Sequence, residues 1–462
     1  MAQRPGSAGP RPLRDREAAL ELADRVVGFA RGAEQLEAVV VASEGTEIRA
    51  HRGTVEHNVS SSEAAVGVRV VDSGRTGVSW TDVLEDTALE QCVAEARDNS
   101  RFSSVNENAG VADPDGVVPT LLERSATGPT DPGVRAKVDL ALQIDAGVFG
   151  ADPRVVGHEG ADYLDVSELF AVATTTGIRA SSRSSIAQAG TWALASDGDD
   201  TASGFGLSFG HRFHEVDPVE VVEEAVRRST SMLGAVQVPS ARMVVVLEPY
   251  VTSELLAAVA PMFSGESVLK GRSPYAGRVG EAVAAEGVSL RDDPLDAAAV
   301  GAVEVDAEGL ATRTVDLISD GVLSGFMHNS YSARCLGTTS TASAVRAGHR
   351  GVPGVGPAVL TLAPGTDEPA AILASVDDGL LVTELSGLHS GLNTVSGDLS
   401  VGVEGRRIRN GELAEPVREV TIATTVQRLL ADVIAIGCDH MRFPWESAGV
   451  TLAVAEVTVS GH

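Results

Sequence analysis

Residues 314–326 read Thr-Val-Asp-Leu-Ile-Ser-Asp-Gly-Val-Leu-Ser-Gly-Phe, two short apolar runs separated by Asp320-Gly321. Asp-Gly accepts positive φ at both central positions of a two-residue turn, so this stretch predicts a β-hairpin. Asn410-Gly411 predicts a second hairpin for the same reason. Further strands are expected at 358–362, 379–385 and 450–459, with a helix around 425–436. The C-terminal half is therefore expected to be a β-rich barrel or sandwich with a few helices.

The N-terminal half alternates helices with strands. Helices are expected at 16–31, 84–97 and 134–148, and strands at 37–43, 46–52 and 64–71. The β-prone pieces of 155–210 read as a second sheet, and Asp217-Pro218 opens a further helix with an N-cap residue before proline. The fold class is therefore α+β, with mixed sheets flanked by helices in the N-terminal region and a β-rich domain after them.

Composition along the chain predicts where the domains begin and end. Residues 1–15 read as a disordered tail, because they are rich in Pro, Gly and Arg and carry no apolar run. Residues 16–232 form the expected N-terminal α/β domain, with a sub-boundary near the Pro-, Gly-, Asn- and Asp-rich stretch 103–132. Residues 240–462 form the expected C-terminal domain.

The charge balance argues against nucleic acid as a partner. The chain has 462 residues, with 36 Lys and Arg against 64 Asp and Glu, for a formal net charge of −28 that would repel a phosphate backbone.

The three cysteines are far apart, which argues against disulfides or a thiolate zinc site. No stretch approaches the roughly 20 apolar residues that cross a bilayer. We therefore expect a soluble, cytoplasmic protein with no nucleic-acid or membrane partner.

The sequence lacks the motifs that are typical of a hydrolase. No helix carries two histidines and a glutamate at zinc-binding spacing, and there is no Gly-x-Ser-x-Gly. The loop 386–398 is more distinctive, because it follows an apolar strand and holds three glycines among hydrogen-bonding side chains. Such a loop either approaches a ligand or another chain, or is only an awkward connection between strands.

The order of several segments resembles the TldD/PmbA peptidase family, and more closely its PmbA branch, also called TldE. The resemblance covers nearly the whole chain after the tail. Its matching segments are 52–58, 67–70, 306–313, 320–326, 331–337, 340–346, 393–400 and 409–417.

The resemblance implies that this chain lacks the family's zinc site. In the TldD branch, a helix carries His-Glu-x-x-x-His and a later cysteine completes the site. Here Ala257, Ala258 and Met262 occupy the three ligand and acid positions, and none of them can hold zinc or accept a proton. The region of the later cysteine offers His389 or Ser390 instead. No metal and no catalytic residue is therefore expected in this chain.

The resemblance also implies a partner and a substrate. A TldE-like chain would pair with a TldD-like subunit that holds the zinc, and the heterodimer would degrade or trim small unfolded peptides, in leader-peptide processing or peptide clearance. A strand-rich wall can hold an extended peptide by adding it to a sheet edge. Arg334, His389 and Asn393 are the candidate contacts of that chamber wall, with hydrogen bonds inside the subunit as their alternative role.

Two other functions stay open from the sequence. The chain could be an independent metal-dependent hydrolase that uses dispersed groups, either His211, His214 and Glu215 or His328 and His389. It could also be a homodimeric binding or regulatory module that acts through protein partners.

Overall fold

The computed structural model describes residues 13, 15–122 and 132–461. Most of the predicted tail 1–15, and part of the predicted sub-boundary 103–132, therefore lie outside the described residues. The first helix, α1 (Arg16–Val27), begins at Asp15, whose side chain accepts the N–H of Glu17 as an N-cap.

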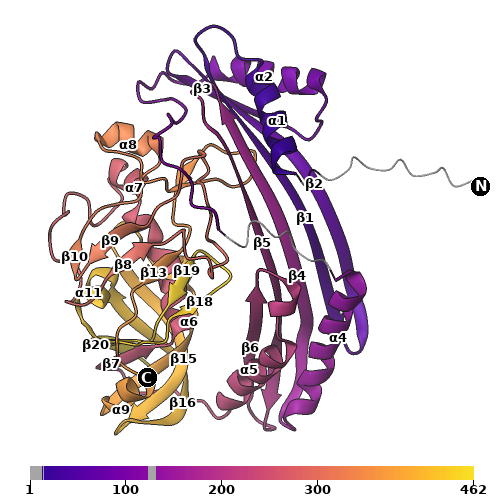
Figure 1. Cartoon of the computed structure of the whole chain (residues 1–462). Helices are drawn as coiled ribbons and strands as arrows, with labels where there is room; N and C mark the ends of the chain where they lie inside the picture. Colours follow the sequence, from indigo (N-terminus) through magenta and orange to yellow (C-terminus); the bar gives the residue numbers. More distant parts are fainter. Residues whose placement is uncertain (1–12, 14, 123–131, 462) are drawn as a thin grey trace, which may run out of the picture.

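One long antiparallel sheet dominates the N-terminal region (Figure 1). Its strands lie in the order β3-β2-β1-β4-β5-β6. They are β1 (Gln35–His51), β2 (Thr54–Asp72), β3 (Arg75–Thr81), β4 (Val155–Thr174), β5 (Arg179–Ser196) and β6 (Thr201–Gly210). The predicted second sheet within 155–210 is wrong, because β4 pairs with the free edge of β1 and extends the first sheet. Segments on both sides of 103–132 thus share one sheet.

Helices cover one face of this sheet, and the C-terminal domain faces the other (Figure 1). The residues of β1 alternate accordingly: Val40 packs under α1 and α2, whereas Val39 packs with Leu310 of the C-terminal domain. The covering helices after α1 are α2 (Asp86–Ser100), α4 (Val134–Ala151) and α5 (Pro218–Ser231), with the short η1 (Phe213–Glu215) before α5.

Five strands of the C-terminal domain close into a barrel, because β16 pairs with both β15 and β20. They are β7 (Ala241–Leu247), β14 (Asp378–Ser386), β15 (Asp398–Arg409), β16 (Glu412–Thr425) and β20 (Leu452–Ser460), and β17 (Val433–Ile436) extends the sheet beyond β20. The α+β class and the barrel-like C-terminal domain are confirmed. The predicted helix 425–436 is shorter than expected, since α11 (Val426–Ala431) ends before β17.

A second set of short strands packs beside the barrel. It comprises β8 (Leu290–Asp292), β9 (Val315–Ser319), β10 (Val322–Leu323), β13 (Leu360–Leu362), β18 (Met441–Arg442) and β19 (Ser447–Gly449), with β11 (Ala344–Val345) and β12 (Gly354–Val355) as a separate pair. Both predicted hairpins are confirmed: Asp320 and Gly321 have φ of 48° and 80°, and Asn410 and Gly411 have φ of 49° and 79°.

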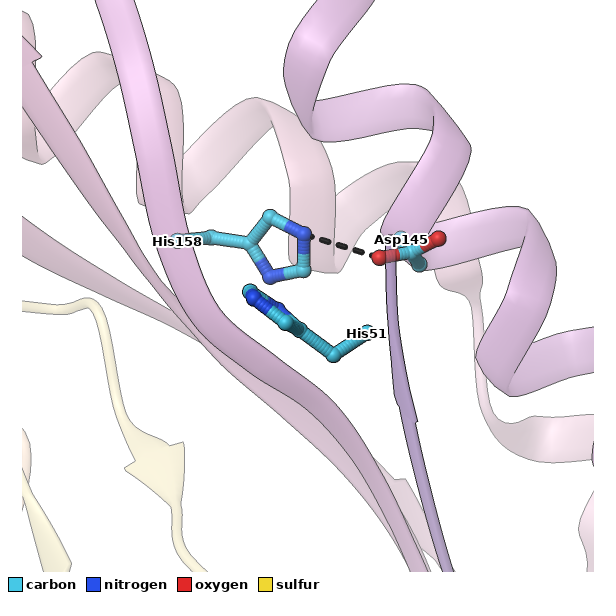
Figure 2. A group of neighbouring side chains, drawn as sticks. All are labelled: His51, Asp145 and His158. Carbon is cyan, nitrogen blue, oxygen red and sulfur yellow. Dashed lines mark ion pairs between the residues drawn. The ribbon is translucent and has the colours of Figure 1, made fainter. Parts of the chain in front are cut away.

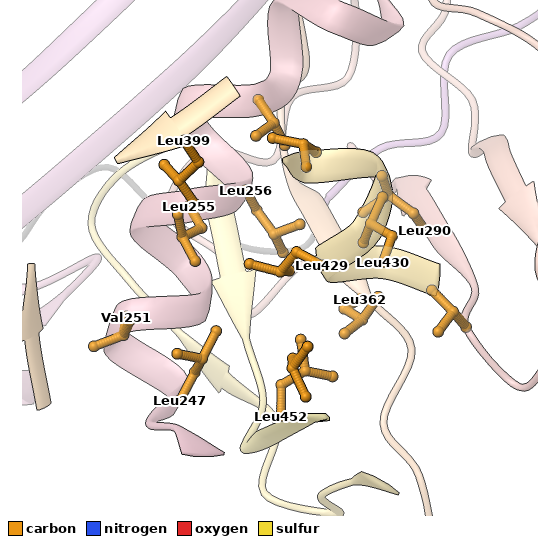
Figure 3. Packing of buried hydrophobic residues seen from close by; sticks show 14 of the residues in the cluster. Leu247, Val251, Leu255, Leu256, Leu290, Leu362, Leu399, Leu429, Leu430 and Leu452 are labelled. Atoms are coloured by element: carbon orange, nitrogen blue, oxygen red, sulfur yellow. The ribbon is translucent and has the colours of Figure 1, made fainter. Parts of the chain in front are cut away.

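One helix of this domain, α6 (Pro249–Val259), buries its inner face in the largest of the core clusters (Figure 3). Val251, Leu255 and Leu256 fall on one side at helical spacing and pack among leucines from the barrel and from α11. The other short helices are η2 (Ala260–Phe263), α7 (Gly265–Leu269), α8 (Ser330–Leu336), α9 (Pro369–Ala374) and α10 (Leu388–Gly391). Within the described residues, no helix combines the length and apolar character that a membrane crossing requires.

Buried ion pairs tie the two regions together. Arg346 of the C-terminal domain contacts Glu37 of β1, and Arg69 of β2 donates to the same carboxylate at 2.6 Å. Burial would raise the pKa of Glu37, but the two guanidinium groups outweigh it and lower that pKa to about 2. The interface therefore depends on a carboxylate that stays ionised.

Candidate functional site

An open groove of about 520 Å³ runs along the outer side of α6. Ala257 and Ala258 line it from the helix, and His389 lines it from α10. The structure thus brings together two of the positions onto which the resemblance places the zinc motif and the loop singled out in the sequence. The remaining lining residues are Glu254, Leu388, Leu392, Thr394 and Trp445.

The helix changes character at Pro261, and this removes Met262 from the groove. The α-helical part ends at Val259, and residues 260–263 continue as the 3-10 turn η2, because Pro261 has no N–H to donate to the preceding turn. The Met262 side chain is fully buried in the core. Of the three positions onto which the resemblance places the zinc motif, only Ala257 and Ala258 face the groove.

The loop 386–398 presents His389 to solvent beside the two alanines. Gly387 adopts a left-handed conformation, with φ of 74°, and starts the short helix α10. Asn393 is exposed and lies between two lining residues, Leu392 and Thr394. Its side-chain oxygen accepts the N–H groups of Val395 and Ser396, so it organises the loop.

Arg334 lies elsewhere, on α8. Its guanidinium donates to the main-chain carbonyls of Asn108, Gly110 and Val111, and it does not line the groove. These bonds connect α8 to the N-terminal domain.

The groove is closed on one side by Trp445, which is anchored to the helix. Its indole Nε1 donates to Ser253 Oγ at 2.7 Å, and Ser253 is fully buried in α6. Sequence reasoning missed both Trp445 and Glu254. Glu254 lies three residues before Ala257, so helical spacing could have placed it on the same face. Trp445 is distant in the sequence and gave no such signal.

Carboxylates gather at the N-terminal end of α6 around Arg228 of α5. The side chain of Tyr250 donates to Glu254 at 3.0 Å, and burial nevertheless raises the pKa of Glu254. Burial, together with repulsion from Glu404 and Glu254, raises the pKa of Glu384 to about 7, although Arg228 opposes the shift. Burial at this end of the helix therefore favours the protonated forms of Glu254 and Glu384.

The groove does not fit a zinc ion. A structural or catalytic zinc takes three or four nitrogen, sulfur or carboxylate ligands from the protein. The lining supplies His389 and Glu254 only. Cys335 lies on α8, and Cys438 is exposed beside Asp367, whose carbonyl accepts its N–H; neither cysteine lines the groove.

A cluster of metal-ligand residue types lies in the N-terminal domain instead (Figure 2). Among the described residues, His51, Asp145 and His158 are the only three such side chains whose ligand atoms all lie within 4.8 Å of one another. His158 Nε2 lies 2.9 Å from Asp145, and the rings of His51 and His158 meet edge to face with centroids 5.0 Å apart.

The hydrogen bonds of this cluster match a structural clamp better than a metal site. Asp145 accepts the N–H groups of Arg52 and Gly53, which form the turn between β1 and β2. His158 Nδ1 accepts the N–H of Gly160, so in a neutral ring the proton lies on Nε2, which is 2.9 Å from Asp145 but is not aligned for a hydrogen bond to it. A metal at Nε2 would instead need a proton on Nδ1, where the Gly160 donor already points.

The other histidines proposed for an independent hydrolase do not assemble into a site within the described residues. The Glu215 side chain accepts the N–H groups of His211 and Arg212 and so caps the turn η1. His328 is buried, and burial lowers its pKa; it contacts Ser332 and does not line the groove that contains His389.

Comparisons with known proteins agree with the order of domains. Profiles of the PmbA/TldA metallopeptidase family match domain 1 at residues 36–100, the central domain at 128–233 and the C-terminal domain at 240–461. The chain belongs to the PmbA/TldD metallopeptidase family. The resemblance inferred from the sequence is thereby confirmed.

Members of both branches of the family are among the relatives. The chain is 25% identical over 422 residues to the metalloprotease PmbA of Escherichia coli O157:H7, covering 91% of this chain and 90% of that protein. It is 24% identical over 384 residues to a metalloprotease TldD homolog of Haemophilus influenzae, covering 80% and 78%.

Solved structures share the fold over nearly all of the chain. A putative modulator of DNA gyrase from Thermotoga maritima superposes with a TM-score of 0.87 at 25% identity, covering 95% of this chain and 99% of that one. TldE from Thermococcus kodakarensis superposes with a TM-score of 0.84 at 21% identity, covering 96% and 99%.

Proposed function

We propose that this chain is the non-catalytic, TldE-like subunit of a heterodimeric zinc peptidase. A TldD-like partner would hold the zinc on its His-Glu-x-x-x-His helix, and this chain would form part of the chamber in which small or unfolded peptides are cut. In this proposal the chain contributes shape and contacts, and its partner contributes the hydrolytic chemistry.

The composition of the groove beside α6 carries the proposal. Ala257 and Ala258 face outward at positions where a TldD-type helix carries a ligand and an acid, and Met262 is turned into the core. The groove keeps one imidazole and one carboxylate, which are too few to bind zinc. Its apolar walls and open shape are suited to an extended peptide that a partner cleaves.

His389 is the residue of this chain that the geometry favours as a peptide contact. Its exposed imidazole lies at the groove, where it can donate to a peptide carbonyl or accept a peptide N–H. Asn393 adjoins the groove with its amide nitrogen available, whereas Arg334 is committed to three carbonyls of its own chain. We rank the three candidates in that order.

Co-expression with a His-Glu-x-x-x-His subunit tests the proposal. We expect the two chains to co-purify in equal amounts, and peptide cleavage to require both. Replacing the motif's glutamate in the partner should abolish cleavage and leave the complex intact. A partner that is fully active by itself and never associates, or a zinc-loaded and active preparation of this chain alone, would show that the proposal is wrong.

A further inference from the structure

The two faces of strand β6 carry side chains of different size, and its sequence shows this. Small residues alternate with large apolar ones along 204–209. A Cβ atom at Gly206 would lie 1.9 Å from the carbonyl oxygen of Val221, and one at Gly204 would lie 2.2 Å from the Ser229 nitrogen. The glycines are therefore required because α5 rests directly on this face of the strand.

The opposite face of β6 carries large side chains toward the C-terminal domain. Phe205, Leu207 and Phe209 line a cavity of about 460 Å³ between the two domains. Tyr250 of α6 faces Phe205 with ring centroids 4.6 Å apart, and Phe443 also lines the cavity. Ligand sites commonly have volumes of roughly 300–1,000 Å³, an apolar and aromatic lining and a position between domains.

The aromatic residues connect this cavity to the groove beside α6. Phe, Tyr and Trp make up only 4% of the chain, yet several of them form one continuous series across the domain boundary. Tyr250 meets Phe443 at 5.7 Å and Trp445 at 5.8 Å, and Phe443 stacks on Trp445 at 5.1 Å. Because Trp445 lines the groove, the cavity and the groove lie on two sides of one aromatic wall.

The charged residues of the cavity make its rim attractive to cations. Arg228 lies over the rings of Phe205 and Tyr250, and it is ion-paired with Glu224 at 2.6 Å and Glu248 at 3.2 Å. The other basic side chains of the lining are also engaged: Arg227 pairs with Glu224, and Arg442 pairs with Asp296. The acidic residues of the lining are Glu220, Glu224, Glu248 and Asp439.

Two of these carboxylates, Glu220 and Asp439, have no ion pair among the described residues, and their partners are hydroxyl and amide groups. Burial raises the pKa of Glu248 in spite of Arg228 and Arg227, and Glu224 adds repulsion. A second cation brought to this rim would relieve the repulsion, whereas an anion would add to it.

We propose that this interdomain cavity is a binding subsite for a large apolar side chain, aromatic or leucine-like, of a peptide that carries a positive charge beside it. The proposal rests on the proposed function in taking a peptide as the ligand. It adds a preference for particular residues, which would come from this chain and not from its catalytic partner. The aromatic wall receives the side chain, and the carboxylate rim receives the charge.

Calorimetric titration of the isolated full chain with short blocked peptides tests this inference. The probes are acetyl-Gly-Phe-Lys-Gly-amide, acetyl-Gly-Ala-Lys-Gly-amide and acetyl-Gly-Phe-Glu-Gly-amide. We expect the Phe-Lys peptide to bind about tenfold or more tightly than either of the others, because each lacks one of the two recognised groups. Equal affinity for all three, or no binding of the Phe-Lys peptide, would overturn the inference.

Two pairs of variants locate the binding. Leu207→Trp fills the cavity and should reduce affinity for the Phe-Lys peptide by about tenfold, whereas Ser203→Trp, on the same face of β6 but outside the lining, should not. Glu248→Gln should weaken the preference for Lys over Glu, and the exposed Glu223→Gln should leave it unchanged. If Leu207→Trp and Ser203→Trp bind the peptide alike, the cavity is not the site.

The outcomes separate this inference from the proposed function. A chain that never associates with a TldD-like subunit disproves the proposed function, yet the titrations still decide whether the cavity selects Phe-Lys. If the pair cleaves peptides but shows no preference and no response to Leu207→Trp, the inference is wrong and the proposed function stands.

Discussion

The groove beside α6 and the His51–Asp145–His158 cluster contain opposite kinds of residue. The cluster has two imidazoles and a carboxylate, which are common zinc ligands, but its carboxylate holds the β1–β2 turn. The groove is lined mostly by alanine, leucine and tryptophan, yet it is open to solvent. Residue type alone therefore does not locate a functional site; the burial and the contacts of the side chains after folding must be known as well.

Among the substitutions that test this comparison, replacement of Asp145 should have the largest effect, and that effect is on stability. Asp145→Ala leaves the N–H groups of Arg52 and Gly53 without their acceptor and removes the partner of His158 Nε2. We expect a loss of about 3 kcal/mol in the free energy of unfolding, measured by urea denaturation. The exposed Asp139→Ala on the same helix is the control and should change stability by less than about 0.5 kcal/mol. Equal losses for the two variants would contradict the clamp.

A bulky residue in the groove should have the opposite effect. It should lower peptide cleavage and leave the free energy of unfolding unchanged. Ala258→Trp fills the groove and is expected to lower peptide cleavage by the reconstituted pair about tenfold, because the peptide path is narrowed. The matched control is Ala431→Trp, an exposed helical alanine of α11 outside the groove. Cleavage rates and urea midpoints measured on both variants decide the matter. If Ala258→Trp cleaves at the rate of the control, the groove is not part of the peptide path.

The pH dependence of stability tests the electrostatics of the carboxylates near α6. The pKa of Glu384 is raised to about 7 in the folded chain, so its contribution to stability is fully present below its ordinary pKa near 4.5 and is lost as pH rises through 7. Glu384→Gln removes that loss and should be about 1 kcal/mol more stable relative to the wild type at pH 8 than at pH 5. Thermal unfolding at both pH values measures the difference. A pH-independent difference between the two proteins would refute the raised pKa.

The smallest expected effect concerns His389. Since its side chain is exposed, His389→Ala should leave the free energy of unfolding within about 0.5 kcal/mol of the wild type. In the reconstituted pair it should raise KM about threefold with little change in kcat, because one hydrogen bond to bound peptide is lost. A fall in kcat of the same size at unchanged KM would mean that His389 acts in the chemical step.

The sequence predicted the parts of the fold that depend on local chemistry. Asp320-Gly321 and Asn410-Gly411 form the expected hairpins, because positive φ is a property of those residues themselves. Asp217-Pro218 starts α5 for a similar local reason. The error at 155–210 has a different origin: which strand edge accepts β4 depends on pairing across more than a hundred residues, and no local pattern encodes it.

The candidate site also divides into features that the sequence predicts and features that only the structure shows. The sequence alone shows that Ala257 and Ala258 carry no metal-ligating atom, since no arrangement of neighbours can make a methyl group bind a metal. Only the tertiary structure shows that Met262 turns into the core, that Trp445 closes the groove, and that Phe205 and Tyr250 meet across the domain boundary. The reason is physical: what a side chain is chemically able to do is set by its own atoms, whereas what it contacts is set by packing between segments that are distant in the chain.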